Sequence, residues 1–183
     1  IHGDDKGLVL PPKVAPMQVV IVPIYKNDEG KNSVLHKVEE IQNKLELKDI
    51  RVHVDDREGM SPGYKFNDWE LKGVPLRIEI GPKDIENQNI VVAKRYNLEK
   101  ISLGFTEIEK ISTILDEIQT EMLKKAKEQA ENNTLNISDY SEFKSKIEEG
   151  GFFNSPWCGK LECEEQIKEE TGAEIRVIPF GSE

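Results

Sequence analysis

The stretch 55–95 mixes cations, aromatic rings and carboxylates, three kinds of side chain that together could bind RNA. Cations hold phosphates, aromatic rings stack on unpaired bases, and a carboxylate accepts the N–H donors of a guanine. Such a mixture favours base-specific recognition of single-stranded RNA. The alternative is an ordinary solvated strand face whose aromatic residues belong to the core. The residues are Tyr64, Lys65, Phe66, Asp68, Trp69, Glu70, Lys72, Arg77, Glu79, Lys83, Asp84, Lys94 and Arg95.

A second arrangement with chemical potential is the C-x4-C pair formed by Cys158 and Cys163. A structural zinc site takes four ligands, so this pair supplies half of one. The alternative is that both are small buried apolar residues, a common state of a free cysteine. The histidines at 2, 36 and 53 are not spaced as metal ligands, and no Walker-type loop or Rossmann glycine pattern is present.

The charge of the chain is unevenly distributed. The 183 residues contain 25 Lys and Arg against 35 Asp and Glu, a formal net charge of -10 that argues at first against a polyanionic partner. Residues 101–183 carry 9 basic and 18 acidic residues, whereas residues 61–100 carry 7 and 6. An anionic partner is therefore compatible with the middle of the chain. The longest apolar run, 17–25, is far shorter than the roughly 20 residues that span a bilayer.

The first half of the sequence predicts an α/β arrangement. Three prolines within 7–16 predict an extended linker. The β-branched run 18–24, the helical apolar stripe 33–47 and the alternation 50–54 then predict a βαβ unit. The alternation over 74–80 predicts a strand with one apolar and one polar face.

The second half predicts a long helix and then a smaller domain. A strand is expected at 90–94, and Thr106 with Glu109 reads as a capping box that opens a helix ending near residue 127. The polar stretch 127–136 predicts a domain boundary. Beyond it we expect a helix capped by Asp139 and ending at Gly150, an acidic helix at 164–171 and a strand at 174–180.

Three segments of the sequence resemble the carboxyl-terminal part of prolyl-tRNA synthetases of the archaeal and eukaryotic form. They are HGDDKGLVLPPKVAP from His2, QVVIVPIY from Gln18 and SPGYKFNDWELKGVPLRIEIGPKD from Ser61. The resemblance implies that residues 1–16 are the end of a catalytic domain and a linker. Residues 17–127 would be the anticodon-binding domain, a mixed five-stranded sheet with flanking helices. Residues 128–183 would be a small α+β carboxyl-terminal domain, zinc-binding-like and truncated.

The resemblance also implies roles for individual residues. Glu70, Arg77, Lys83 and Asp84 stand where that family reads two adjacent guanines of the proline anticodon. Phe66 and Lys72 are further candidates for RNA binding, and Trp69 is either a stacking platform or a core residue. Cys158 and Cys163 are candidate zinc ligands of the complete protein. A closed site of four cysteines cannot form from these two residues alone.

The implied parent protein is a class II proline–tRNA ligase that uses ATP and Mg²⁺, works in the cytoplasm and forms a homodimer. On this interpretation the chain is a noncatalytic part of a longer protein, and its partner is a tRNA for proline. One alternative is that the anticodon-binding fold serves as an interaction module in a nonenzymatic accessory protein. Another is a small-molecule-binding α/β domain, since many folds share a βαβ opening.

Overall fold

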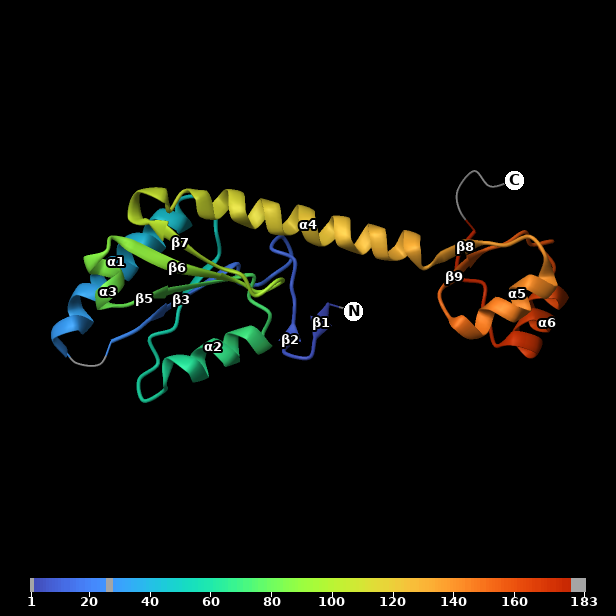
Figure 1. Ribbon diagram of the computed structural model, residues 1–183, viewed down its shortest axis with the longest axis horizontal. Coiled ribbons are helices and arrows are strands. Elements are labelled where there is room, and N and C mark those ends of the chain that lie inside the picture. Colours follow the sequence, from blue (N-terminus) through green and yellow to red (C-terminus); the bar gives the residue numbers. More distant parts are fainter. Residues whose placement is uncertain (1, 26–27, 179–183) are drawn as a thin grey trace. The chain divides into compact units, whose positions relative to one another are not determined.

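The β-branched run of the sequence forms β3 (Val19–Pro23), a strand buried along its whole length in a five-stranded sheet (Figure 1). It lies parallel to β4 (Val52–Val54) on one side and to β5 (Leu76–Ile80) on the other. The sheet continues through two antiparallel neighbours, β6 (Asn89–Lys94) and β7 (Lys100–Gly104). The mixed five-stranded sheet with flanking helices is therefore confirmed.

The computed structural model describes residues 2–25 and 28–178, which fall into two units, Ile1–Lys124 and Lys125–Glu183. The division lies within helix α4 (Lys110–Asn132). None of the helices in the described part of the chain combines the length and apolar character needed to cross a membrane.

One face of the sheet carries the main core. Helix α1 (Asp28–Glu46) packs there with the stripe predicted for it, and α4 adds the stripe predicted for the long helix. Both helices bury their apolar residues on this face. The apolar positions repeat about every 3.6 residues in the sequence, and this spacing correctly predicted both helices. The buried helical residues are Val34, Val38, Ile41, Leu45, Ile111, Ile114, Leu115 and Ile118.

Helix α2 (Pro62–Leu71) covers part of the opposite face, packing Trp69 against β3 and Val74. Ser61 caps the helix, because its hydroxyl oxygen accepts the backbone N–H of Tyr64 at 3.2 Å. The polar face predicted for β5 is present, with Arg77 and Glu79 paired on it, but it is largely covered. Glu79 is only 8 % exposed, because residues of neighbouring elements form ion pairs over this face.

The predicted linker begins with a two-stranded hairpin, β1 (Gly3–Asp4) and β2 (Gly7–Leu8). The hairpin lies directly against the end of α2. Gly7 has φ +126°, and a Cβ there would stand 2.5 Å from Leu71 Cα. Gly73, with φ +72°, would likewise place a Cβ 2.6 Å from Leu8 Cβ. This close backbone approach requires glycine at both positions.

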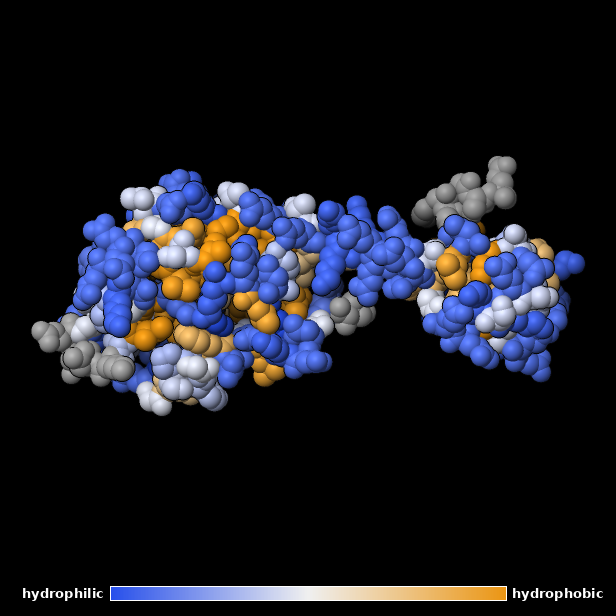
Figure 2. Space-filling view, viewed as in Figure 1, coloured by the Kyte–Doolittle hydropathy of each residue, from blue (hydrophilic) through white to orange (hydrophobic). Residues whose placement is uncertain are grey.

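The capping box predicted from Thr106 and Glu109 is wrong. A 3-10 turn, η1 (Phe105–Glu107), precedes α4, and the Glu107 carboxylate accepts the Gly104 N–H at 3.1 Å. Helix α4 also extends to Asn132, beyond the predicted end near 127. Its last turns bury no residue and have a hydrophilic surface (Figure 2), but Ala, Lys, Glu and Gln favour helix without burial.

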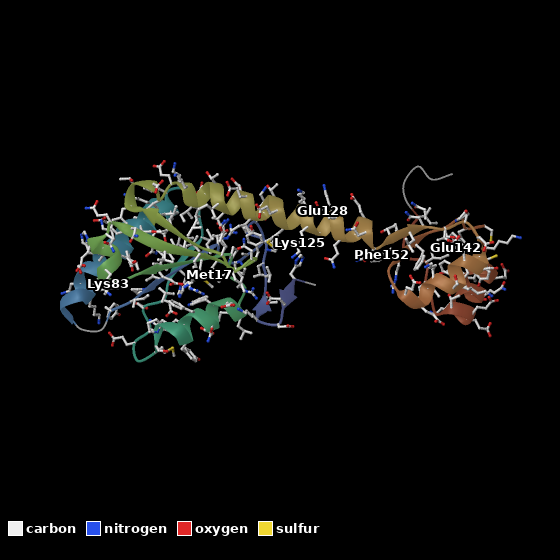
Figure 3. The ribbon with its side chains drawn as sticks, viewed as in Figure 1. Met17, Lys83, Lys125, Glu128, Glu142 and Phe152 are labelled. Atoms are coloured by element: carbon white, nitrogen blue, oxygen red, sulfur yellow. The ribbon has the colours of Figure 1, made fainter. Side chains whose placement is uncertain are left out.

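The second unit is small. A parallel pair, β8 (Thr134–Asn136) and β9 (Phe152–Asn154), accompanies α5 (Tyr140–Lys146), η2 (Ile147–Glu149) and α6 (Leu161–Thr171). Glu142, labelled in Figure 3, donates its N–H to Asp139 Oδ1 at 2.8 Å, which confirms that cap. The strand expected at 174–180 is wrong for residues 174–178, which form no strand, and residues 179–180 lie outside the described part.

Candidate nucleic-acid interface

A cavity of about 200 Å³ opens between the end of α2, the sheet and the N-terminal hairpin. Five of its eleven lining residues are Lys or Arg, and one is the carboxylate Glu70. The predicted mixture of cations and a carboxylate is therefore brought together at one place in the fold. The lining residues are Lys6, Val20, Trp69, Glu70, Val74, Arg77, Ala93, Lys94, Arg95, Leu98 and Lys100.

Glu70 has an acceptor atom available inside this cavity. Its side chain is 18 % exposed, and its Oε1 is buried without a hydrogen-bond partner in the described part of the chain. The ammonium of Lys6 lies 3.5 Å from that oxygen as an ion pair. Because a buried acceptor without a donor costs about 1–3 kcal/mol, a ligand that donates N–H groups to Oε1 would recover that free energy.

Arg77 and Phe66 lie together beside the cavity. Arg77 donates from Nε and Nη2 to Glu79 Oε1 at 3.1 and 2.9 Å, and its guanidinium stands 4.3 Å from the centre of the Phe66 ring. Lys100 also pairs with Glu79, at 2.9 Å. Glu79 thus holds in place two cations that line the cavity, Arg77 and Lys100. Phe66 stacks on the Arg77 guanidinium and is half-buried. It packs against the smaller cluster around Trp69 rather than in the main core.

Trp69 is a core residue, so its interpretation as a stacking platform is wrong. The side chain is 5 % exposed, and its indole N–H donates to Asp55 Oδ2 at 2.7 Å. Lys72 lies outside it, 4.3 Å from the ring centre, and pairs with Asp68 at 3.0 Å. The Lys72 side chain is about half exposed and can reach a ligand in solution.

The two remaining candidates lie at the other end of β5 from Arg77 and do not line the cavity. Asp84 caps the short helix α3 (Pro82–Glu86), its Oδ2 accepting the Gly81 N–H at 2.7 Å. Lys83, labelled in Figure 3, is exposed on the same helix. The structure therefore divides the four predicted base-reading residues into a cavity pair, Glu70 and Arg77, and an α3 pair, Lys83 and Asp84.

The hairpin contributes residues that the sequence reasoning placed in a linker. Arg95 is 5 % exposed and donates to both carboxylate oxygens of Asp4, at 2.8 and 2.6 Å. Its Nε donates to the backbone carbonyl of Glu70 at 2.8 Å. These hydrogen bonds hold the pKa of Asp4 well below its usual range. The Asp-Asp-Lys-Gly run at 4–7 is a turn signal that could have indicated the hairpin.

Asp55 forms a separate, fully buried network behind the site. Arg57 donates to its two carboxylate oxygens at 2.8 and 2.7 Å, and Lys65 donates to its backbone carbonyl at 2.9 Å. Burial acts to raise the pKa of Asp55, but the hydrogen bonds from Arg57 and Trp69 outweigh it and hold that pKa well below its usual range. This network ties α2 to the end of β4.

Cys158 and Cys163 lie in the second unit as free thiols, with their Sγ atoms 2.9 Å apart. Cys158 is exposed, so the alternative of a buried apolar residue does not hold for it. In the described part of the chain, no three His, Cys, Asp or Glu residues are grouped so that they could hold a metal ion. The pair therefore does not by itself fit a closed zinc site, which needs four ligands.

Comparison with known families accounts for this arrangement. Residues 18–117, which include the sheet, α2 and Glu70, match the family model described as the anticodon binding domain. The chain belongs to the anticodon-binding domain family. Residues 140–183 match the model described as the prolyl-tRNA synthetase C-terminal domain. The resemblance to prolyl-tRNA synthetase is thereby confirmed.

Individual relatives agree with both matches. The chain is 51 % identical to a proline–tRNA ligase of Acetoanaerobium sticklandii over 100 % of its own length. It is 48 % identical to proline–tRNA ligase 2 of Clostridioides difficile, again over its whole length, and 48 % identical to a proline–tRNA ligase of Cenarchaeum symbiosum over 99 %. The chain spans 38 % of the length of each of these relatives.

Proposed function

We propose that this chain binds the anticodon loop of a tRNA for proline and reads two adjacent guanines in it. The support is its membership of the anticodon-binding domain family, together with relatives named proline–tRNA ligases at about half identity. The alternative of a nonenzymatic interaction module has no such support. The protein to which the chain belongs would attach proline to that tRNA.

The observation that carries this proposal is the Glu70 carboxylate, with one buried oxygen lacking a donor. Guanine offers two neighbouring donors, N1–H and the exocyclic N2–H, on its Watson–Crick edge. A carboxylate can accept both, and a base that lacks them leaves the oxygen unsatisfied. The cavity cations, Arg77 among them, supply positive charge for the guanine O6 and the adjoining phosphates.

The α3 pair would bind the second guanine. Asp84 uses Oδ2 for the cap of α3, and within the described residues no hydrogen bond engages its Oδ1, which is the atom that would accept from this base. Lys83 and Lys72 would hold phosphates or O6. Phe66, covered on one side by the Arg77 guanidinium, would stack on a base with its remaining face.

The whole protein's other properties are also proposals. It would use ATP and Mg²⁺ in a class II catalytic domain, work in the cytoplasm as a homodimer, and leave this chain without catalytic residues. Cys158 and Cys163 would bind zinc only with two further ligands from outside the described residues.

The test is the affinity of the chain for two RNA stem-loops, one with two adjacent loop guanines and one with adenines in their place. Wild-type protein should prefer the guanine loop by tenfold or more, since each bidentate contact is worth about 1–3 kcal/mol. Glu70→Gln and Arg77→Ala should lose most of that preference. Glu39→Gln, an exposed carboxylate on α1 across the sheet, is the matched control.

Two outcomes would contradict the proposal. Equal losses on both loops would make Glu70 and Arg77 structural or phosphate-binding residues. No binding of either loop at low salt would favour an interaction module that does not use RNA.

A further inference from the structure

We propose that Lys6, on the N-terminal hairpin, reads the guanine O6 while Glu70 accepts N1–H and N2–H of the same base. The inference rests on the proposed function and deepens it, because it adds a specificity-determining residue from outside the sheet and α2. Lys6 would act by direct contact with the base. The hairpin would then form one wall of the base-reading site.

The first support is that the hairpin is held firmly against Glu70. Arg95 joins the two, donating to both oxygens of Asp4 and to the backbone carbonyl of Glu70. The close approaches of Gly7 to Leu71 and of Gly73 to Leu8 fix the same contact on the other side. Lys6 therefore projects from a short turn whose two ends are both anchored beside the carboxylate.

The second support is the state of the five cations that line the cavity. Arg77 and Lys100 are both engaged by Glu79. Lys94 pairs with Glu99 at 2.8 Å, and Arg95 pairs with Asp4. Lys6 differs from these four, because its ammonium faces Glu70 at 3.5 Å without a hydrogen bond to that carboxylate among the described residues.

The Lys6 side chain also has room to adjust. It is 56 % exposed, so it approaches Glu70 from the solvent side and can change its conformation without disturbing the core. An incoming base would insert its edge beside the carboxylate and meet the ammonium next to it. Lys6 would exchange its ion pair with Glu70 for a charge-assisted hydrogen bond to the guanine O6.

The chemistry of the guanine edge fits this pair of side chains. O6, N1–H and N2–H follow one another as acceptor, donor and donor. An ammonium beside a carboxylate presents the complementary order. Adenine presents a donor at N6 and an acceptor at N1, so it would face both side chains with the wrong group. Lys6 and Glu70 together would reject adenine more strongly than either alone.

The test uses the 183-residue chain and stem-loops in which one loop guanine is replaced by inosine, which lacks N2–H, or by 2-aminopurine, which lacks both O6 and N1–H. Lys6→Met should weaken binding of the guanine and inosine loops by about tenfold, the scale of one charge-assisted hydrogen bond. It should have no more effect than the control on the 2-aminopurine loop. Glu70→Gln should show its largest loss on guanine and a smaller loss on inosine.

Lys13→Met is the matched control, because Lys13 is an exposed lysine of the same N-terminal segment that does not line the cavity. It should cause the same small loss on every loop, as expected for a general electrostatic contribution. Circular dichroism and urea unfolding of each variant would show whether the fold is retained.

Two results would overturn the inference while the proposed function stands. Lys6→Met could weaken all loops equally, as the control does, or it could tighten binding, which would mean that Lys6 competes with RNA for Glu70. If the wild-type chain does not prefer guanine over adenine at all, the proposed function itself fails, and the inference fails with it.

Discussion

Two carboxylates, Asp55 after β4 and Glu70 on α2, differ in how their oxygens are satisfied. Asp55 is fully buried and receives hydrogen bonds from Arg57 and Trp69. Glu70 keeps a buried oxygen with no hydrogen bond in the described part of the chain and a loose ion pair with Lys6. Both lie within the same unit.

The difference separates a structural carboxylate from one suited to binding. A buried charge that is fully hydrogen-bonded fixes its neighbours, and removing it leaves those neighbours uncompensated. A buried oxygen without a donor lowers stability by about 1–3 kcal/mol and leaves an acceptor for a ligand. Asp55 therefore fixes α2 in place, and α2 presents Glu70 to the cavity.

The largest expected effect follows from breaking the saturated network. Asp55→Ala would leave Arg57 and Lys65 facing an empty buried position, so the free energy of unfolding should fall by about 3–5 kcal/mol. Urea unfolding at neutral pH measures this loss. Glu70→Gln should change the same quantity by less than about 1 kcal/mol, since Oε1 has no hydrogen bond to lose. Comparable losses in the two variants would remove the distinction drawn between the carboxylates.

Acid provides the next largest effect. Hydrogen bonds hold the pKa of Asp55 below its ordinary value of about 3.9, so its contribution to stability is fully present above that pH and is lost as the pH falls through the lowered value. Below about pH 4 the wild-type chain should therefore lose stability more steeply than Asp55→Asn. The difference between the two slopes of unfolding free energy against pH should correspond to roughly one additional proton bound on unfolding.

Urea titrations at pH 5, 4 and 3 would measure these slopes. Asp56→Asn is the control, because Asp56 is the exposed neighbour of Asp55 and has no place in the network. If Asp55→Asn and the wild type lost stability in parallel as the pH falls, the network would not hold Asp55 ionised.

The strands β3, β4, β5 and β6 and the two core helices could be predicted because their apolar periodicity coincides with burial, whereas β7, which is mostly unburied, was not predicted. Val38, Ile41 and Ile118, for example, are buried at the positions that a helical stripe requires. The hairpin could not be predicted in this way, because Gly3–Leu8 buries little and is held by Arg95, which lies 91 positions from Asp4. The start of α4 was misplaced because Glu107, rather than Thr106, makes the local cap.

The candidate site was only partly predictable for the same reason. Residue types and the family resemblance indicated Glu70 and Arg77, but composition cannot show which carboxylate has its oxygens satisfied. Trp69 illustrates this limit, since a tryptophan in a run of charges suits a base platform until the Asp55 acceptor is seen. Lys6 was missed because nothing in the segment before the proline-rich stretch 7–16 indicates that it folds back onto α2.

The smallest expected effect concerns Lys83 of the α3 pair, which lies outside the cavity. Lys83→Met removes an exposed cation with no role in the cavity, so it should weaken all RNA loops by a few-fold if Lys83 holds a phosphate. The salt dependence of the affinity should then fall by about one unit in slope.

If Lys83 instead reads O6 of the second guanine, the loss should fall mainly on loops that contain that base. Measuring Lys83→Met on guanine and 2-aminopurine loops at two salt concentrations separates the two roles. A base-dependent loss would place specificity at both ends of β5 and not in the cavity alone.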